Sequence, residues 1–254
     1  MTPIILPMIP AHKKYVEAFA GGAALFFAKG PSLVEVLNDI NGNVANFYRV
    51  MKMQFEALCL EIEATLHCEH TYKEARYIYR NPKDYDPLKR AWAFWVGSAM
   101  SFGSNLFTHF QITSNSADRS NPGSQTAHKR ERFRLTAGRL DNAMILEKDA
   151  LVVIEKYNQV DTFLYLDPPY IDVNQGHYKG YSREDFEALL KKIAGFNGRW
   201  ILSSYQSDLL QDAVDTYGWV QTEFDQRLGV KGNKQRKTEV ITANFQFEPN
   251  LFNQ

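Results

Sequence analysis

Four consecutive residues, Asp167-Pro168-Pro169-Tyr170, have the groups needed to bind and activate the amino group of a nucleobase. The lone pair of an aromatic amine is delocalised into the ring, and hydrogen-bond acceptors aimed at both amino protons make it available for attack. The carboxylate of Asp167 accepts one proton, and a backbone carbonyl held rigid by Pro168 and Pro169 accepts the other. Tyr170 offers a flat face for an unstacked base. The alternative is a turn that merely ends a strand.

A second candidate element is the glycine turn between Glu17 and Ala23, which contains Gly21 and Gly22. Glycines allow the backbone to approach a ligand and expose the N-terminus of a following helix. The spacing differs from the dinucleotide-binding Gly-x-Gly-x-x-Gly pattern, and close packing of a helix on a strand is the alternative explanation.

A third element is Asp39, about twenty residues further on, where a carboxylate is able to accept both hydroxyls of a ribose. The alternative is that Asp39 caps the helix that follows it. Taken together, the three elements predict a nucleoside-cofactor site at one sheet edge, beside a turn that activates an amine. Methyl transfer from a sulfonium fits such a site, because it requires positioning and electrostatics and no covalent intermediate.

The elements that position these residues alternate between strand and helix. Strands are expected at 15–19, 33–37, 144–146, 162–166 and 200–202, with a hairpin formed by 219–224 and 239–247. Helices are expected at 23–29, 43–66, 149–156, 182–194 and 207–216. This alternation predicts an α/β fold with a parallel sheet and crossover helices. Residues 1–66 and 140–254 are expected to form this domain, and 67–139 a helical insertion.

The net charge is zero, with 29 basic and 29 acidic residues, but the basic residues are clustered. Residues 119–139 hold six basic side chains and Glu131 alone as an acid, and residues 227–237 hold five basic side chains and no acid. Two clusters of this kind predict contact with nucleic-acid phosphates, whereas solvated surfaces are the alternative. In the insertion, Ser101, Asn105, Thr108 and Gln111 are candidates for reaching base edges, while Trp92, Phe94 and Trp95 are expected to pack in its core.

The composition is that of a globular protein, since 44% of the residues are hydrophobic and 23% are charged. Residues 1–10 lack the basic flank of a signal peptide, and the two cysteines, Cys59 and Cys68, do not form a disulfide framework. A soluble cytoplasmic protein is expected. The segment 67–70 (His-Cys-Glu-His) lacks a second cluster at ligand spacing, so no metal is expected.

The segments YVEAFAGGAALFF, NDINGNVANFY and FLYLDPPY resemble those of the D12-class (Dam-like) DNA adenine-N6 methyltransferases. RWILSSYQSD and KTEVITANF resemble later segments of the same family, so the resemblance covers most of the chain. It implies a Rossmann-like AdoMet-dependent methyltransferase sheet with a terminal β-hairpin, interrupted by a target-recognition insertion at 67–139. It also implies methyl transfer from S-adenosylmethionine (AdoMet) to N6 of an adenine flipped out of duplex DNA.

The residues predicted to carry this activity fall into three groups. Catalytic residues are Asp167, Pro168, Pro169 and Tyr170. Cofactor-binding residues are Glu17, Phe19, Ala20, Gly21, Gly22, Asp39, Ile40, Asp149, Ala150 and Asp167. DNA-binding residues are Asn105, Arg119, Lys129, Arg130, Arg132, Lys179, Tyr181, Lys234, Arg236 and Lys237. The enzyme is expected to act as a monomer, with a cognate restriction endonuclease as a separate partner.

The chain departs from the family pattern before Pro10. Relatives usually carry a Gly-Gly-Lys loop about a dozen residues ahead of the matching proline, whereas Met1 begins after that point. A defect in binding the methionine end of AdoMet is therefore expected. Three alternatives remain: an RNA adenine-N6 methyltransferase, a catalytically impaired DNA-binding homologue, and a glutamine methyltransferase. The last would carry Asn in place of Asp167.

Overall fold

The computed structural model describes residues 1–101, 106–111, 134, 136–170, 181–224 and 239–247. They divide into two compact units. The first comprises residues 1–40, 148–170, 181–224 and 239–247, and the second comprises 41–101, 106–111, 134 and 136–147. The assignment of residues 67–139 to target recognition remains a prediction.

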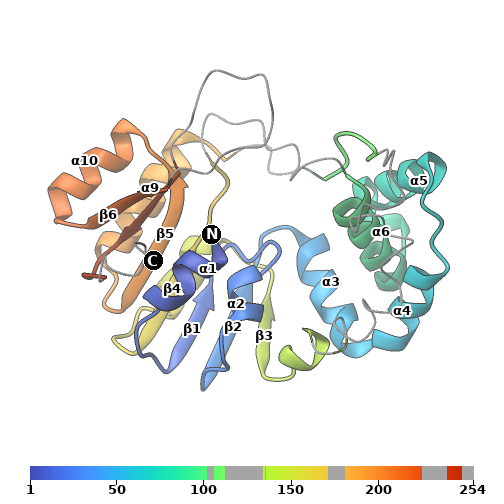
Figure 1. Cartoon of the computed structure of the whole chain (residues 1–254), viewed down its shortest axis with the longest axis horizontal. Helices are drawn as coiled ribbons and strands as arrows, with labels where there is room; N and C mark the ends of the chain where they lie inside the picture. Colours follow the sequence, from blue (N-terminus) through green and yellow to red (C-terminus); the bar gives the residue numbers. More distant parts are fainter. Residues whose placement is uncertain (102–105, 112–133, 135, 171–180, 225–238, 248–254) are drawn as a thin grey trace. The chain divides into compact units, whose positions relative to one another are not determined.

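The first unit is built on a twisted sheet whose strands have the order β2-β1-β4-β5-β7-β6 (Figure 1). Its strands are β1 (Lys14–Glu17), β2 (Val34–Asn38), β4 (Thr162–Leu166), β5 (Arg199–Tyr205), β6 (Val220–Phe224) and β7 (Glu239–Ala243). The strands β2, β1, β4 and β5 run parallel, and β7 pairs antiparallel with both β5 and β6. The Rossmann-like methyltransferase sheet and its terminal hairpin are therefore confirmed.

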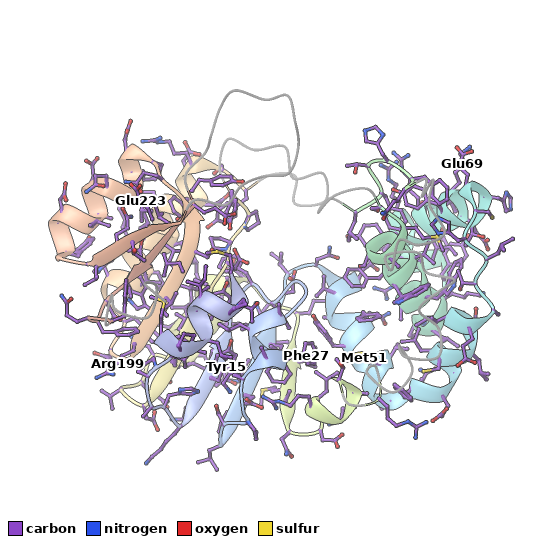
Figure 2. The ribbon with its side chains drawn as sticks, in the orientation of Figure 1. Tyr15, Phe27, Met51, Glu69, Arg199 and Glu223 are labelled. Atoms are coloured by element: carbon purple, nitrogen blue, oxygen red, sulfur yellow. The ribbon has the colours of Figure 1, made fainter. Side chains whose placement is uncertain are left out.

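Helices cover this sheet, and they bury apolar side chains against it. The first unit contains α1 (Thr2–Ile5), η1 (Leu6–Met8), α2 (Ala24–Ala28), α8 (Ala150–Lys156), α9 (Arg183–Ala194) and α10 (Asp208–Tyr217). Helix α1 contacts α2, and α9 contacts both α8 and α10. All five residues of β4 are buried, as expected for a central parallel strand. Tyr15 of β1, labelled in Figure 2, is also fully buried.

The second unit is mostly helical. It contains α3 (Gly42–Met53), α4 (Phe55–Glu63), α5 (Glu69–Arg80), η2 (Pro82–Asp84), α6 (Pro87–Met100) and one strand, β3 (Ala143–Leu146). Helix α6 packs on α3, α4 and α5, and Met51 of α3 (Figure 2) is buried. Trp92 and Phe94 are buried, which confirms their expected place in the core, and Trp95 is half-buried.

Most of the expected elements of the fold are confirmed, with small shifts at their ends. The main difference is the helix expected at 43–66, which is divided into α3 and α4. Gln54 interrupts it with a non-helical backbone (φ −133°, ψ 37°). Helix α9 begins with a capping box, because the Ser182 hydroxyl accepts from the Asp185 amide and the Asp185 carboxylate accepts from the Ser182 amide. Among the described helices, none has the length and apolar character needed to cross a bilayer.

Candidate active site

Three segments of the first unit meet at one edge of its sheet because their strands run parallel and in register. Glu17 at the end of β1 pairs with Leu37 of β2 on one side and with Tyr165 of β4 on the other. The carboxyl ends of neighbouring parallel strands share one edge, which is where ligands bind in open α/β sheets. This edge carries residues 18–23 after β1, residues 39–40 after β2 and residues 167–170 after β4.

The turn after β4 holds Asp167 and Tyr170 beside two residues of β5. The Tyr170 hydroxyl lies 3.4 Å from Asp167 Oδ1 and 3.4 Å from Ser203 Oγ. The Tyr170 ring packs against Tyr205, with ring centroids 4.4 Å apart. Ser203 and Tyr205 were not predicted as site residues from the sequence. Their register position near the end of the strand beside β4 is the only signal for them.

The Asp167 side chain is exposed, and its pKa differs from that of an ordinary aspartate. Its side chain keeps an exposed surface, yet the protein atoms around it reduce its hydration and raise its pKa to about 6. The hydrogen bond from Tyr170 acts in the opposite direction, and the charge of Glu239 raises the pKa further. Asp167 is therefore mainly a carboxylate at pH 7, able to accept a hydrogen bond, and it takes up a proton in mildly acidic solution.

The turn after β1 has the backbone conformation for which its glycines were predicted. Gly21 has φ +45°, a left-handed conformation, and Ala23 shares that region with φ +47°. The Gly21 amide donates to Asp39 Oδ2 at 2.9 Å, and the Ala20 amide donates to the Asn38 carbonyl at 2.8 Å. Asp39 is 4% exposed. The turn after β1 is thus held directly by the end of β2.

The alternative role considered for Asp39, as a helix cap, is excluded by the structure. The N-cap of α3 is Asn41, whose side chain accepts from the Asn43 amide at 3.0 Å. Asp39 instead bonds the glycine turn. Ile40, which follows it, is 64% exposed and offers an apolar surface at the sheet edge.

Asn38 was missed by the sequence analysis and connects the segments of this edge. Its side chain is fully buried, and its Nδ2 donates to the Ala18 carbonyl at 2.9 Å and to the Lys148 carbonyl at 3.0 Å. Its Oδ1 accepts from the Lys148 amide at 3.0 Å. Asn38 therefore fixes the residues beside Phe19 and Asp149. A polar residue that ends an apolar strand is the sequence signal that points to it.

Asp149 and Ala150 begin helix α8. The Asp149 side chain is exposed and accepts from the Leu151 amide at 2.8 Å, so Asp149 is the N-cap of α8. Ala150 is buried. The predicted contact of both residues with the cofactor remains a prediction.

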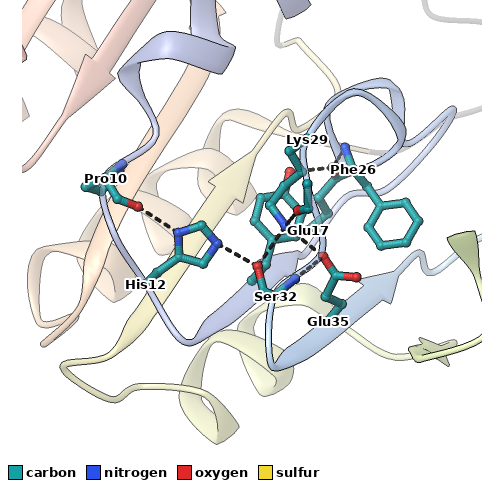
Figure 3. Close-up of polar contacts among 9 residues, drawn as sticks. Pro10, His12, Glu17, Phe26, Lys29, Ser32 and Glu35 are labelled. Carbon is teal, nitrogen blue, oxygen red and sulfur yellow. Dashed lines mark hydrogen bonds and ion pairs between the residues drawn. The ribbon is translucent and has the colours of Figure 1, made fainter.

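Glu17, also predicted to bind the cofactor, has its carboxylate directed into the fold (Figure 3). Its Oε1 accepts from the Tyr15 hydroxyl at 2.6 Å and from the Phe26 amide of α2 at 2.8 Å. Burial raises its pKa to about 7, and the charge of Lys29 opposes that change. Glu17 therefore holds helix α2 against the end of β1 through its bond from the Phe26 amide.

A buried polar network continues from this point toward the start of β2 (Figure 3). Lys29 Nζ forms an ion pair with Glu35 at 2.7 Å, and both side chains are almost completely buried. Lys29 also donates to Ser32 Oγ at 2.7 Å, and the His12 ring lies 2.8 Å from the same oxygen. Breaking one partner of such a pair leaves an uncompensated charge, so the network stabilises the connection from α2 to the start of β2, at the edge of the sheet opposite the site.

The structure places the predicted catalytic residues and the segments 18–23 and 39–40 at the carboxyl edge of one sheet, whereas the carboxylate of Glu17 is directed into the fold. Of the predicted DNA-binding residues, only Tyr181 is among those described, and it lies in the first unit. The others lie outside the described residues: Asn105, Arg119, Lys129, Arg130, Arg132, Lys179, Lys234, Arg236 and Lys237.

Two further sequence candidates have structural roles in the second unit. Ser101 is buried, and its hydroxyl donates to the Gly97 carbonyl and accepts from the Phe107 amide. It is therefore engaged in packing and does not reach a base edge. Cys68 caps α5 through the Thr71 amide. Within the described part of the chain, no group of three His, Cys, Asp or Glu side chains is arranged to hold a metal ion.

The sheet order, the terminal hairpin and the three segments at its edge define the class of Rossmann-like methyltransferases. Sequence comparison gives the family. The model of the D12 class N6 adenine-specific DNA methyltransferases matches residues 1–225, and the chain belongs to this family. It is therefore an enzyme that methylates adenine in DNA at N6, and the family uses AdoMet as the methyl donor.

Individual relatives agree with this assignment. The type II methyltransferase M1.LlaDCHI of Lactococcus lactis subsp. cremoris is 25% identical over 275 residues, which cover 96% of this chain and 91% of the relative. The type II methyltransferase M.CviBI of Paramecium bursaria Chlorella virus NC1A is 24% identical, covering 91% and 89%. A DNA N-6-adenine-methyltransferase of Escherichia phage P1 is 28% identical over 72% of this chain and 24% of its own length.

Proposed function

We propose that the turn after β4 binds the target adenine and activates its amino group. Asp167 accepts one proton of N6, and the backbone of the Pro168-Pro169 segment accepts the other. The ring of Tyr170 stacks on the base. The observation that carries this proposal is that Asp167 follows the central strand β4 immediately, beside the turn after β1. Its raised pKa still leaves it ionised at pH 7.

AdoMet is proposed to bind along the same edge, over the ends of β1 and β2. Bound there, it supplies a methyl group on a positively charged sulfur. Asp39 follows β2 directly and is held against the glycine turn by the bond from Gly21, and a carboxylate at this position is suited to accept from ribose hydroxyls. The exposed apolar surface of Ile40 suits a purine ring. Phe19 and the Ala20-Gly21-Gly22 turn border the sulfur.

The substrate is proposed to be duplex DNA with the adenine flipped out of the helix. An adenine inside the duplex does not reach a carboxylate at a sheet edge, so the base must leave the stack. The basic residues of 119–139 and 227–237 are proposed to bind its phosphates. The names of two relatives as type II methyltransferases support a separate restriction endonuclease as partner. One site per chain suits a monomer, and a cytoplasmic location remains a prediction.

The test is transfer of labelled methyl from AdoMet to duplex DNA, with RNA as the competing substrate. Digestion of the product to nucleosides should place the label in N6-methyladenine from DNA. Asp167→Ala should abolish transfer while the duplex still binds, because the substitution removes an acceptor of the amine and leaves the basic clusters unchanged. Preferential labelling of RNA, or near-normal turnover by Asp167→Ala, would contradict the proposal.

A further inference from the structure

Tyr181 lies against the turn that follows β1. Its ring meets Phe19 edge to face, with centroids 6.1 Å apart and an angle of 86° between the planes. Both residues belong to the first unit, so this contact lies within one compact body. Tyr181 was predicted to bind DNA, whereas its ring contacts Phe19, a residue predicted to bind AdoMet.

The hydroxyl of Tyr181 is buried and has no hydrogen-bond partner among the residues that the structure describes. Buried polar groups are nearly always paired, so an unpaired hydroxyl in a native fold requires an explanation. Burial raises the pKa of Tyr181, and the charges of Asp185 and Asp149 raise it further. The phenol therefore stays neutral and is able both to donate and to accept a hydrogen bond.

The neighbours of Tyr181 are fixed in place by Asn38. The Asn38 side chain bonds the Ala18 carbonyl, next to Phe19, and both backbone groups of Lys148, next to Asp149. Tyr181 contacts Phe19 and lies within electrostatic range of Asp149. Tyr181 therefore lies close to Phe19 and Asp149, which were both predicted from the sequence to bind the cofactor.

We propose that Tyr181 binds the nucleoside half of AdoMet, whose ring nitrogens and ribose hydroxyls provide the partner that its hydroxyl lacks. This inference rests on the proposed function, which places AdoMet at the same edge of the sheet. It reassigns Tyr181 from DNA recognition to cofactor binding. The Phe19–Tyr181 pair then forms one wall of the cofactor site.

The test compares Tyr181→Phe with Tyr217→Phe in the full-length chain. Both substitutions remove one phenolic hydroxyl, but Tyr217 is exposed on α10 and stacks on Trp219. Calorimetric titration with S-adenosylhomocysteine and with 5′-methylthioadenosine measures binding of the whole cofactor skeleton and of its nucleoside half. Tyr181→Phe should weaken both about 3- to 10-fold, the loss expected for one hydrogen bond. Tyr217→Phe should bind both ligands as the wild type does.

Kinetics and DNA binding separate this role from a structural one. Tyr181→Phe should raise KM for AdoMet by the same factor, while kcat at saturating AdoMet and Kd for duplex DNA stay within about twofold of the wild type. Unchanged affinity for both ligands together with weaker DNA binding would return Tyr181 to the DNA surface and overturn the inference. A wild-type enzyme that binds neither ligand would overturn the proposed site itself.

Discussion

Lowering the pH from 7 to 5 should reduce kcat/KM for methyl transfer about tenfold, because Asp167 must be ionised to accept a proton of the adenine amine. With a pKa of about 6, Asp167 is about 90% ionised at pH 7 and about 10% ionised at pH 5. An aspartate with the ordinary value of 3.8 would still be about 90% ionised at pH 5 and would give almost no decrease.

The assay is initial-rate methylation of a duplex from pH 5 to 8 at constant ionic strength. The quantity kcat/KM reports ionisations of the free enzyme, which is the state that the structure describes. Circular dichroism at each pH is the control for loss of folding. A folded enzyme whose kcat/KM is unchanged between pH 7 and 5 would refute the assignment of Asp167.

Two variants identify the titrating group. Glu17→Gln retains an oxygen that accepts from Tyr15 and Phe26. The decrease of kcat/KM at acidic pH should therefore keep its midpoint near pH 6 in this variant. Glu239→Gln removes a charge that raises the pKa of Asp167, so the midpoint of the decrease in kcat/KM should move to lower pH. If kcat/KM of Glu17→Gln no longer decreased at acidic pH, the titrating group would be Glu17 and not Asp167.

Further predictions concern the support of the site and the DNA surface. Asn38→Ala should raise KM for AdoMet more than tenfold with a smaller change in kcat, and Asn38→Asp should not restore it, because a carboxylate cannot donate to Ala18 and Lys148. Glu17 has a pKa of about 7 when folded against 4.5 ordinarily, so its contribution to stability is present below pH 4.5 and is lost as the pH rises through 7. The melting temperature of Glu17→Gln relative to the wild type should therefore increase from pH 5 to pH 8, and a constant difference would contradict that pKa. Neutralising Lys129, Arg130 and Arg132 together should weaken duplex binding and flatten its dependence on salt, whereas an unchanged slope would show a solvated surface.

The sheet could be predicted from the sequence because its strands are short apolar segments with polar residues at their ends. The strand β4 matches its predicted range, and Asp167 follows it directly. The three segments predicted to form the site, which are the turn after β4, the glycine turn and Asp39, each follow the end of a strand. Parallel pairing then places them at one edge, since neighbouring strands in register end together.

The side-chain contacts could not be predicted, because they join residues far apart in the sequence. Asn38 bonds Lys148 across 110 positions, and its place at the end of an apolar strand does not indicate which residue it bonds. The direction of the Glu17 carboxylate depends on Tyr15 two residues away on the same face of β1 and on the placement of α2. Tyr181 was predicted to bind DNA, whereas its ring packs on Phe19 in the turn after β1, a contact between residues 162 positions apart.

The most direct measurement is a crystal structure of the enzyme with S-adenosylhomocysteine and a duplex containing its methylation site. The account predicts a flipped adenine with N6 within hydrogen-bonding distance of Asp167, its ring on Tyr170, and the cofactor sulfur facing N6 from the side of the turn after β1. A cofactor bound away from this edge, or an adenine whose amino group is turned away from Asp167, would contradict it.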